Sequence, residues 1–174
     1  MTKDVMDAIR ERRSIRRFKA DPVPEATLGR LLESAVQAPS AGNLQPWFFY
    51  VVKKAEIREE LARAAGYQKF VAEAPVTIVV CADVPRSARY YGRRGAELYC
   101  LQDTAAAIQN LMLAATAFGL GTCWVGAFSE EMTRNVLQLP DHLRPVALIP
   151  VGYPVRQPAP RPRRPLEEVV KLVD

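Results

Sequence analysis

The sequence predicts a single domain that contains both helices and strands. Its 174 residues are enough for one hydrophobic core, and 49% apolar with 25% charged residues is an ordinary globular composition. Helical and strand-like apolar patterns alternate along the chain without an internal repeat or a domain linker. We therefore expect one domain over residues 1–174, in which residues 154–174 form an extended C-terminal arm.

The first half of the chain shows three helical and two strand patterns. Apolar residues recur at helical spacing in residues 4–12, between Pro24 and Pro39, and in residues 55–65. Residues 47–52 are aromatic and β-branched, and residues 76–81 form a short apolar run, so both are expected to be strands.

The second half contains the longest helical pattern, over residues 95–118. Gly119 is expected to cap that helix, and Ser129 is expected to begin another that ends near Leu137. Strands are expected at residues 122–126 and 146–151. Beyond Gly152 prolines become frequent, which predicts an arm that runs extended along a surface and buries its apolar end against a partner.

The cysteine, histidine and apolar patterns argue against several classes of site. Cys81, Cys100 and Cys123 are widely spaced in apolar segments, so we expect core thiols and no disulfide or metal site. The one histidine, His142, lies in a turn-like segment, which argues against a histidine-based triad. No apolar run approaches the roughly 18 residues that span a bilayer, so we expect a cytoplasmic protein without membrane contact.

The most informative segment is the arginine-rich tract over residues 12–18. Guanidinium groups match phosphate oxygens, and Ser14 adds a hydroxyl donor. A solvated basic helix end is the plain alternative. The formal charge of +5 also raises nucleic-acid binding, but the arginines concentrate in this tract and in residues 156–164, and no recognisable nucleic-acid-binding module accompanies them. We therefore favour a small phosphate and expect no nucleic acid.

Three motifs, at residues 12–16 (RRSIR), 39–47 (PSAGNLQPW) and 119–128 (GLGTCWVGAF), resemble those of the FMN-dependent nitroreductase family in order and spacing. The resemblance, to a short member, runs from Met6 to about Val170. It implies an α+β fold in which helices flank a central mixed sheet. It also implies an intertwined homodimer with FMN at the interface and a C-terminal arm that reaches the partner.

The resemblance assigns the FMN phosphate and ribityl chain to residues near both ends of the chain: Arg12, Arg13, Ser14, Arg16, Arg161 and Arg163. It assigns the isoalloxazine ring to a loop that the partner chain supplies, through Pro39, Ser40, Ala41 and Asn43. Arg164 is left open between phosphate contact and a solvated charge. So is the role of Tyr67, Gln68, Phe70, Tyr91 and Arg93 as lining of the site.

The strand end Trp124, Val125, Gly126 and Ala127 matches the family segment that faces flavin N5. The resemblance implies that a backbone N–H, of Gly126 or Ala127, points at N5 and stabilises the reduced ring. Many members have an acidic residue followed by glycine here, whereas this chain has Gly126-Ala127. The effect of the missing carboxylate on redox tuning is left open.

The implied activity is oxidoreduction, in which NADH or NADPH delivers hydride to FMN and a small-molecule acceptor such as a quinone or nitroaromatic receives it. The sequence has no Rossmann fingerprint, because Gly119-Leu120-Gly121 follows a helix and lacks the third glycine. The alternatives are a specialised flavin reaction (dehalogenation, flavin fragmentation or substrate dehydrogenation) and a non-catalytic flavin- or nucleic-acid-binding protein.

Overall fold

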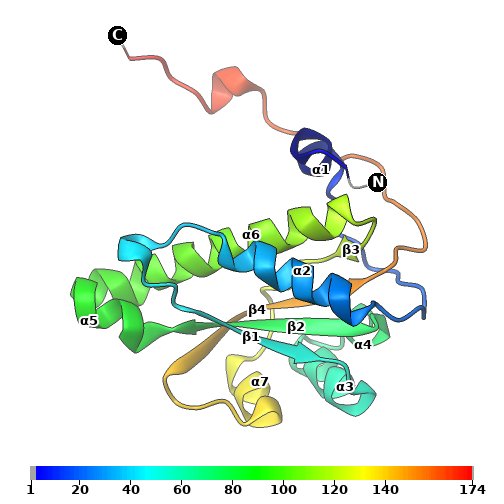
Figure 1. The fold of residues 1–174 in the computed structure, drawn as a ribbon, viewed down its shortest axis with the longest axis horizontal. Coiled ribbons are helices and arrows are strands. Elements are labelled where there is room, and N and C mark those ends of the chain that lie inside the picture. The colour runs from blue at the N-terminus through cyan, green and yellow to red at the C-terminus, as the bar shows by residue number, and fades with distance from the viewer. Residues whose placement is uncertain (1–2, 174) are drawn as a thin grey trace.

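The computed structural model describes residues 3–173, so positions 1, 2 and 174 of the expected domain lie outside the described residues. One sheet with strand order β1-β2-β4-β3 forms the middle layer. The strands are β1 (Trp47–Val52), β2 (Val76–Asp83), β3 (Gly121–Thr122) and β4 (Leu143–Gly152). Helices cover both faces of this sheet (Figure 1).

Five helices lie within the ranges expected from the sequence: α1 (Val5–Glu11), α2 (Glu25–Val36), α3 (Ala55–Ala64), α6 (Cys100–Ala117) and α7 (Glu130–Leu137). Helices α4 (Phe70–Glu73) and α5 (Val84–Arg94) were not expected. The Asp4 carboxylate accepts the Asp7 amide at 2.9 Å, and the Ser129 hydroxyl oxygen accepts the Met132 amide at 3.1 Å. These two contacts cap the first turns of α1 and α7, which confirms the expected cap at Ser129.

The central strand β2 explains the uninterrupted apolar run in the sequence. It pairs with β1 on one edge and β4 on the other, and residues 76–82 are all buried. Ile78 and Val80 pack with the α2 and α6 side, whereas Val79 and Cys81 pack with α3, α4 and the end of α7. A strand covered on both faces has no solvent side, so it needs no polar alternation.

The sheet differs in detail from the expected mixed arrangement. All pairings between the four strands are antiparallel, and the parallel component is the isolated bridge between Ser14 and Thr122. The strand expected at residues 122–126 is also shorter, since β3 ends at Thr122 and Val125 alone rejoins the sheet through a bridge to Leu148. The chain between them leaves the sheet and exposes Trp124.

Helix α5 is the main element that the sequence pattern missed. Ser87 is its only buried residue among those that the structure describes, so it has no apolar periodicity to detect. Gly92 interrupts the helix with a φ of +53° and a ψ of −139°, a conformation open to glycine. A single π-helical turn, Gly95–Tyr99, then joins α5 to α6.

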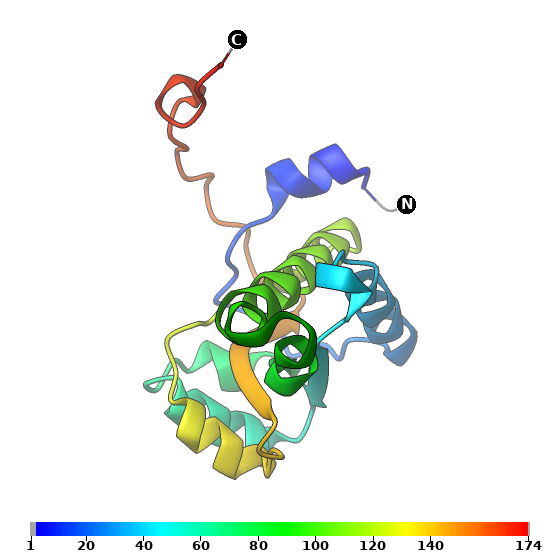
Figure 2. The same ribbon diagram turned by 90° about the vertical axis from the view of Figure 1, so that its left-hand side faces the viewer.

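The C-terminal arm leaves the body beside α1 and extends away from it (Figures 1 and 2). Its root is held by the Lys19 amide on Tyr153 O at 2.8 Å and by the Val155 amide on Arg17 O at 3.0 Å. Five apolar residues of the arm are 53% to 86% exposed: Leu166, Val169, Val170, Leu172 and Val173. Their burial against a partner chain remains a prediction.

Gly95 lies where the π-helical turn crosses α5, and we expect Gly95→Ala to destabilise the fold. A Cβ there would sit 2.3 Å from Ser87 O, a backbone atom that cannot move aside alone. The expected loss is about 1–3 kcal/mol of unfolding free energy. Gly29→Ala is the control, because its Cβ meets nothing within 4 Å and alanine favours helix α2. Urea unfolding measures both variants, and equal free energies of unfolding for Gly95→Ala and Gly29→Ala would contradict this prediction.

Candidate functional site

The two arginine-rich segments meet at one cavity of about 400 Å³. It opens between the extended chain that follows α1 and the root of the arm, which run side by side (Figure 2). The lining residues are Arg12, Arg13, Ser14, Arg16, Pro158, Ala159, Arg161 and Arg163. All six residues assigned to the phosphate and ribityl chain are therefore among the eight that line this cavity, and their role in binding stays a prediction.

The charge around this cavity is uncompensated. Within residues 3–173, none of its five arginines forms an ion pair with a carboxylate, and none of the lining residues is acidic. Five like charges around one hollow repel one another, and a multiply charged anion would relieve this repulsion. The cavity therefore has the chemistry of a phosphate site.

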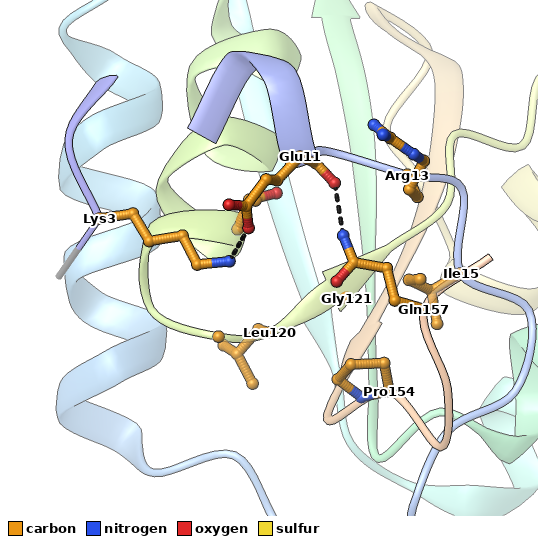
Figure 3. Close-up of a pocket in the computed structure, with 10 residues that line it drawn as sticks. Lys3, Glu11, Arg13, Ile15, Leu120, Gly121, Pro154 and Gln157 are labelled. Carbon is orange, nitrogen blue, oxygen red and sulfur yellow. Dashed lines mark hydrogen bonds and ion pairs between the residues drawn. The ribbon is translucent and has the colours of Figure 1, made fainter. Parts of the chain in front are cut away.

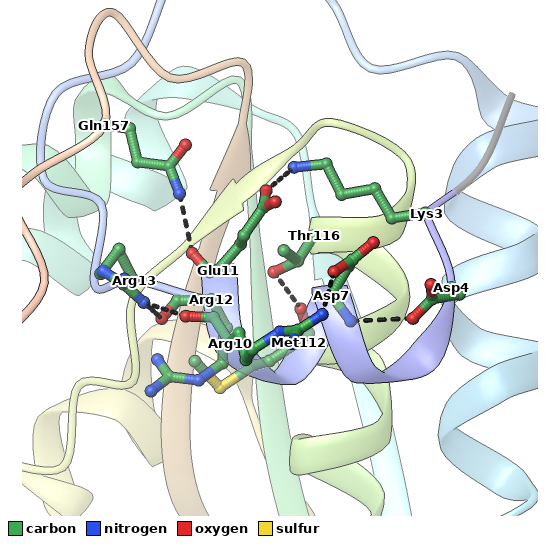
Figure 4. A network of polar contacts seen from close by, with 10 residues as sticks. All are labelled: Lys3, Asp4, Asp7, Arg10, Glu11, Arg12, Arg13, Met112, Thr116 and Gln157. Atoms are coloured by element: carbon green, nitrogen blue, oxygen red, sulfur yellow. Dashed lines mark hydrogen bonds and ion pairs between the residues drawn. The ribbon is translucent and has the colours of Figure 1, made fainter. Parts of the chain in front are cut away.

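Arg13 has a structural role as well. Its Nη1 donates to Arg10 O at 2.6 Å and to Arg12 O at 2.9 Å, carbonyls at the C-terminal end of α1 (Figure 4). A guanidinium on the last carbonyls of a helix satisfies groups that have no intrahelical partner. Its Nε is buried and has no acceptor among the described residues. Arg13 is therefore anchored at the end of α1 through Nη1, and its Nε and Nη2 have no acceptor within residues 3–173.

Gln157 is a residue that sequence reasoning missed. Its Nε2 donates to Glu11 O at 2.8 Å, beside a second, smaller cavity that Lys3 and Arg13 also line (Figure 3). This bond fixes the arm against the end of α1 at Gln157, four positions before Arg161 in the sequence. An amide inside a proline-rich stretch gives no sequence signal for such a contact.

The segment assigned to flavin N5 begins beside the arginine cavity, because the Ile15 amide donates to Thr122 O at 2.8 Å. Val125 exchanges two backbone hydrogen bonds of 3.0 Å with Leu148, so its N–H is occupied. The N–H groups of Gly126 and Ala127 have no acceptor among residues 3–173. Both residues are exposed, and Gln68 Nε2 reaches Ala127 O at 3.3 Å.

Cys123 adjoins the same cavity and stays a thiol. Burial raises its pKa, and the nearby Arg16, Ser14 and Arg12 offset this only in part. Burial also raises the pKa of Cys81 to about 12. All three cysteines are free and buried, which confirms them as core thiols rather than nucleophiles.

The loop assigned to the flavin ring lies elsewhere. Pro39, Ser40, Ala41 and Asn43 adjoin the N-terminal end of α6, where the Ala41 amide donates to Asp103 Oδ1 at 3.1 Å. The two segments that line the arginine cavity, the chain after α1 and the arm, lie toward the other end of this helix (Figure 1). The 18 residues of α6 span about 27 Å. One chain therefore does not bring this loop to its own arginine cavity, and its contact with the partner's flavin stays a prediction.

The residues left open by the sequence divide between these two regions. Phe70 lies by the arginine cavity, since the guanidinium of Arg16 is 5.8 Å from its ring centroid. Tyr91 lies beside the 39–43 loop, with its hydroxyl against Gly42. Gln68 is half-buried and reaches Ala127 O at 3.3 Å. The other three candidates are exposed: Tyr67, Arg93 with its ion pair to Glu97, and Arg164 with its ion pair to Glu168. Arg164 does not line the arginine cavity.

The part of the chain that the structure describes has neither a metal-site cluster nor a membrane-spanning helix. Among residues 3–173, no three histidine, cysteine, aspartate or glutamate side chains gather as a metal site would require. In the same range, no helix has the length and apolar character to cross a membrane.

The fold and the site together define an α+β protein with an arginine-lined cavity at a sheet edge. The model of the nitroreductase family matches residues 9–66 and 63–153. The chain therefore belongs to the nitroreductase family, as the sequence motifs predict.

Relatives and solved structures agree with this assignment. An NADH dehydrogenase of Thermus thermophilus is 37% identical, with 96% of this chain and 95% of the relative covered. An FMN reductase (NADPH) of Bacillus subtilis is 30% identical, with 95% and 72% covered. The NADPH:FMN oxidoreductase of Vibrio harveyi, solved with NAD⁺, superposes at a TM-score of 0.90, with 28% identity and coverage of 99% and 78%.

Proposed function

We propose that this chain is an FMN-dependent oxidoreductase that takes hydride from NADH or NADPH and passes it to a quinone or nitroaromatic acceptor. One observation carries the proposal: five arginines without carboxylate partners within residues 3–173 surround a cavity, and its wall at Ser14 is bridged to Thr122, shortly before two backbone amides that have no acceptor in the same range. The names of the relatives, which include an FMN reductase (NADPH) and an NADH dehydrogenase, support the same cofactor and donors.

The arginine cavity fits the phosphate of FMN. Arg12 and Arg16 approach it from the segment after α1, and Arg161 and Arg163 approach it from the arm. Ser14, exposed on the cavity wall, can donate its hydroxyl to a phosphate or ribityl oxygen. Charge-assisted hydrogen bonds of this kind are about twice as strong as neutral ones. Residues from both ends of the chain would therefore close on one ligand.

FMN, when bound, supplies hydride acceptance and release at N5. The chain's part at that position is electrostatic. Gly126 and Ala127 directly follow Val125, which is bridged to Leu148; both residues are exposed, and their N–H groups have no acceptor within residues 3–173. An amide aimed at N5 stabilises the charge that reduction brings to the ring, without any side-chain acid or base.

The proposal includes a homodimer of single-domain chains. The 39–43 loop and the arginine cavity lie toward opposite ends of α6 (Figure 1). A site that uses this loop together with the arginine cavity therefore needs a second chain. Apolar surface is available for this contact, since Val5, Met6 and Ile9 of α1 are 50% to 62% exposed. Three unpaired cysteines suit the reducing cytoplasm, where we place the enzyme.

The identity of the flavin and its reduction test this function. The purified protein is expected to be yellow and to release FMN on denaturation. Its visible absorption should fall when NADH or NADPH is added without oxygen and should return when a quinone is added. Stoichiometric FAD, or no flavin after reconstitution with FMN, would contradict the proposal, because no adenylate pocket is expected here.

Deletion of residues 158–174 should both release FMN and weaken the dimer, because it removes Arg161, Arg163 and the apolar end of the arm. Deletion of residues 166–174 is the matched control, since it keeps the two arginines. The chain with this shorter deletion should also form a weaker dimer, but at protein concentrations where it is dimeric it should retain FMN, because it keeps Arg161 and Arg163. Flavin absorbance after gel filtration and sedimentation measure the two effects. A dimer with parental FMN affinity after the longer deletion would show that the arm is dispensable.

A further inference from the structure

Asp103, in the first turn of α6, is a buried carboxylate that the proposed chemistry does not use. Its residue is 7% exposed. Oδ1 accepts the Ala41 amide at 3.1 Å, whereas Oδ2 is buried and has no partner among the described residues. Buried polar atoms are nearly always hydrogen-bonded, so a carboxyl with one orphaned oxygen calls for an explanation.

The buried position of the Asp103 carboxyl group is energetically unfavourable. Burial raises the pKa of Asp103, and the hydrogen bond from Ala41 opposes this shift in part. No cation of residues 3–173 forms an ion pair with it. A side chain that only filled this space would be more stable if it were apolar. The one contact that distinguishes Asp103 from such a residue is its bond to the 39–43 loop.

The loop has a specific left-handed backbone. Gly42 and Asn43 have φ values of +56° and +55°, which glycine and asparagine tolerate, and Gln45, just beyond the loop, has a φ of +52°, which residues of its type rarely adopt. Such a conformation persists only when surrounding contacts fix it. Arg86 holds the end of the loop at Leu44 O, and the Ser40 hydroxyl oxygen accepts the Gln45 amide at 3.0 Å.

The bond from Ala41 to Asp103 ties this loop to the long helix. Asp103 is separated from Ala41 by 62 positions in the sequence, so the contact is tertiary. Helix α6 packs against α2 and the sheet, with Ala107, Ile108 and Leu111 fully buried. The middle of the loop is thereby fixed to a rigid element in addition to its own internal hydrogen bonds, such as the Asn43 amide on Ser40 O at 2.9 Å.

We propose that Asp103 is a positioning residue, which fixes the 39–43 loop through the Ala41 amide so that the loop is shaped in advance for the flavin ring. The role at the ring rests on the proposed function. The shaping of the loop does not, because it follows from contacts within one chain. Ordering the loop before the ring arrives avoids an entropic cost on binding, so Asp103 acts on the ring half of the ligand and not on its phosphate.

Hydrogen exchange in the flavin-free protein tests the shaping of the loop. Asp103→Ala should accelerate exchange at the Ala41 amide and across residues 40–45, whereas Asp103→Asn keeps an acceptor oxygen and should restore protection. Thr104→Val is the matched control: Thr104 is 1% exposed and bonds only within its own helix, to Cys100 O and Leu101 O. Unchanged exchange in Asp103→Ala, or the same acceleration in Thr104→Val, would overturn the proposal.

Ligand binding then tests the role at the ring. Asp103→Ala should weaken FMN about tenfold, the low end for a hydrogen bond to a charged group, and should alter the visible spectrum of the bound flavin. Its affinity for inorganic phosphate should stay parental. Equal losses for FMN and phosphate would overturn the assignment to the ring. If the parent protein binds no FMN, the proposed function is wrong, and exchange at Ala41 alone decides whether Asp103 fixes the loop.

Discussion

Arg12→Ala should weaken FMN binding by about 1.5–3 kcal/mol, roughly 10- to 150-fold, the usual scale for a hydrogen bond to a charged group. Arg163→Ala should cost about as much, because the two side chains face the same cavity from opposite segments and neither has a carboxylate partner within residues 3–173. Riboflavin lacks the phosphate, so its affinity should change little. Titration by flavin fluorescence measures both ligands.

Arg164→Ala is the matched control for this prediction. It removes the same charge from the same arm, one position beyond Arg163, but Arg164 does not line the cavity and instead bonds Glu168 at 3.1 Å. Its FMN affinity should remain close to that of the parent. An equal loss in Arg164→Ala would mean that general positive charge, and not placement, attracts the ligand. Parental affinity in Arg12→Ala would remove that residue from the site.

The fold was predictable wherever one element carries its own pattern. Residues 47–52 and 76–81 read as strands because their side chains suit a pleated, buried surface, and both are strands. Helix α5 gave no such signal, because it buries only Ser87 among its described residues. The strand expected at 122–126 failed for a different reason. Gly121 packs against Ile15, where a Cβ would lie 2.5 Å away, and the chain leaves the sheet after Thr122, a tertiary arrangement that the local residue pattern does not contain.

The candidate site was predictable only where the expected ligand requires a particular residue type in clusters, as a phosphate requires arginine. Clusters of arginines are visible in the sequence, and the structure brings both arginine clusters to one cavity. Gln157 and Asp103 were not visible, since each acts through a backbone group distant in sequence, Glu11 O and the Ala41 amide. A pairing of this kind depends on tertiary geometry and leaves no local pattern.

Proline at the backbone donor for flavin N5 should slow flavin reduction by about 10²- to 10³-fold, if that donor acts like an oxyanion-hole amide. Proline has no N–H, so Gly126→Pro and Ala127→Pro each delete one candidate donor. Val125 is not a candidate, because its N–H already bonds Leu148 O at 3.0 Å. Whichever variant removes the true donor should also shift the flavin potential. Stopped-flow reduction by NADPH, at saturating FMN, measures the rate.

Proline also restricts the residue before it, so strain must be separated from the loss of the donor. Gly126→Ala serves this purpose because it keeps the N–H, and its Cβ would meet only Trp124 Nε1 at an ordinary 3.8 Å. It should reduce at close to the parental rate. Both proline variants must be folded and loaded with FMN before the comparison is made. If both then reduce at the parental rate, no backbone hydrogen bond from Gly126 or Ala127 reaches N5, and the electrostatic stabilisation must come from another group.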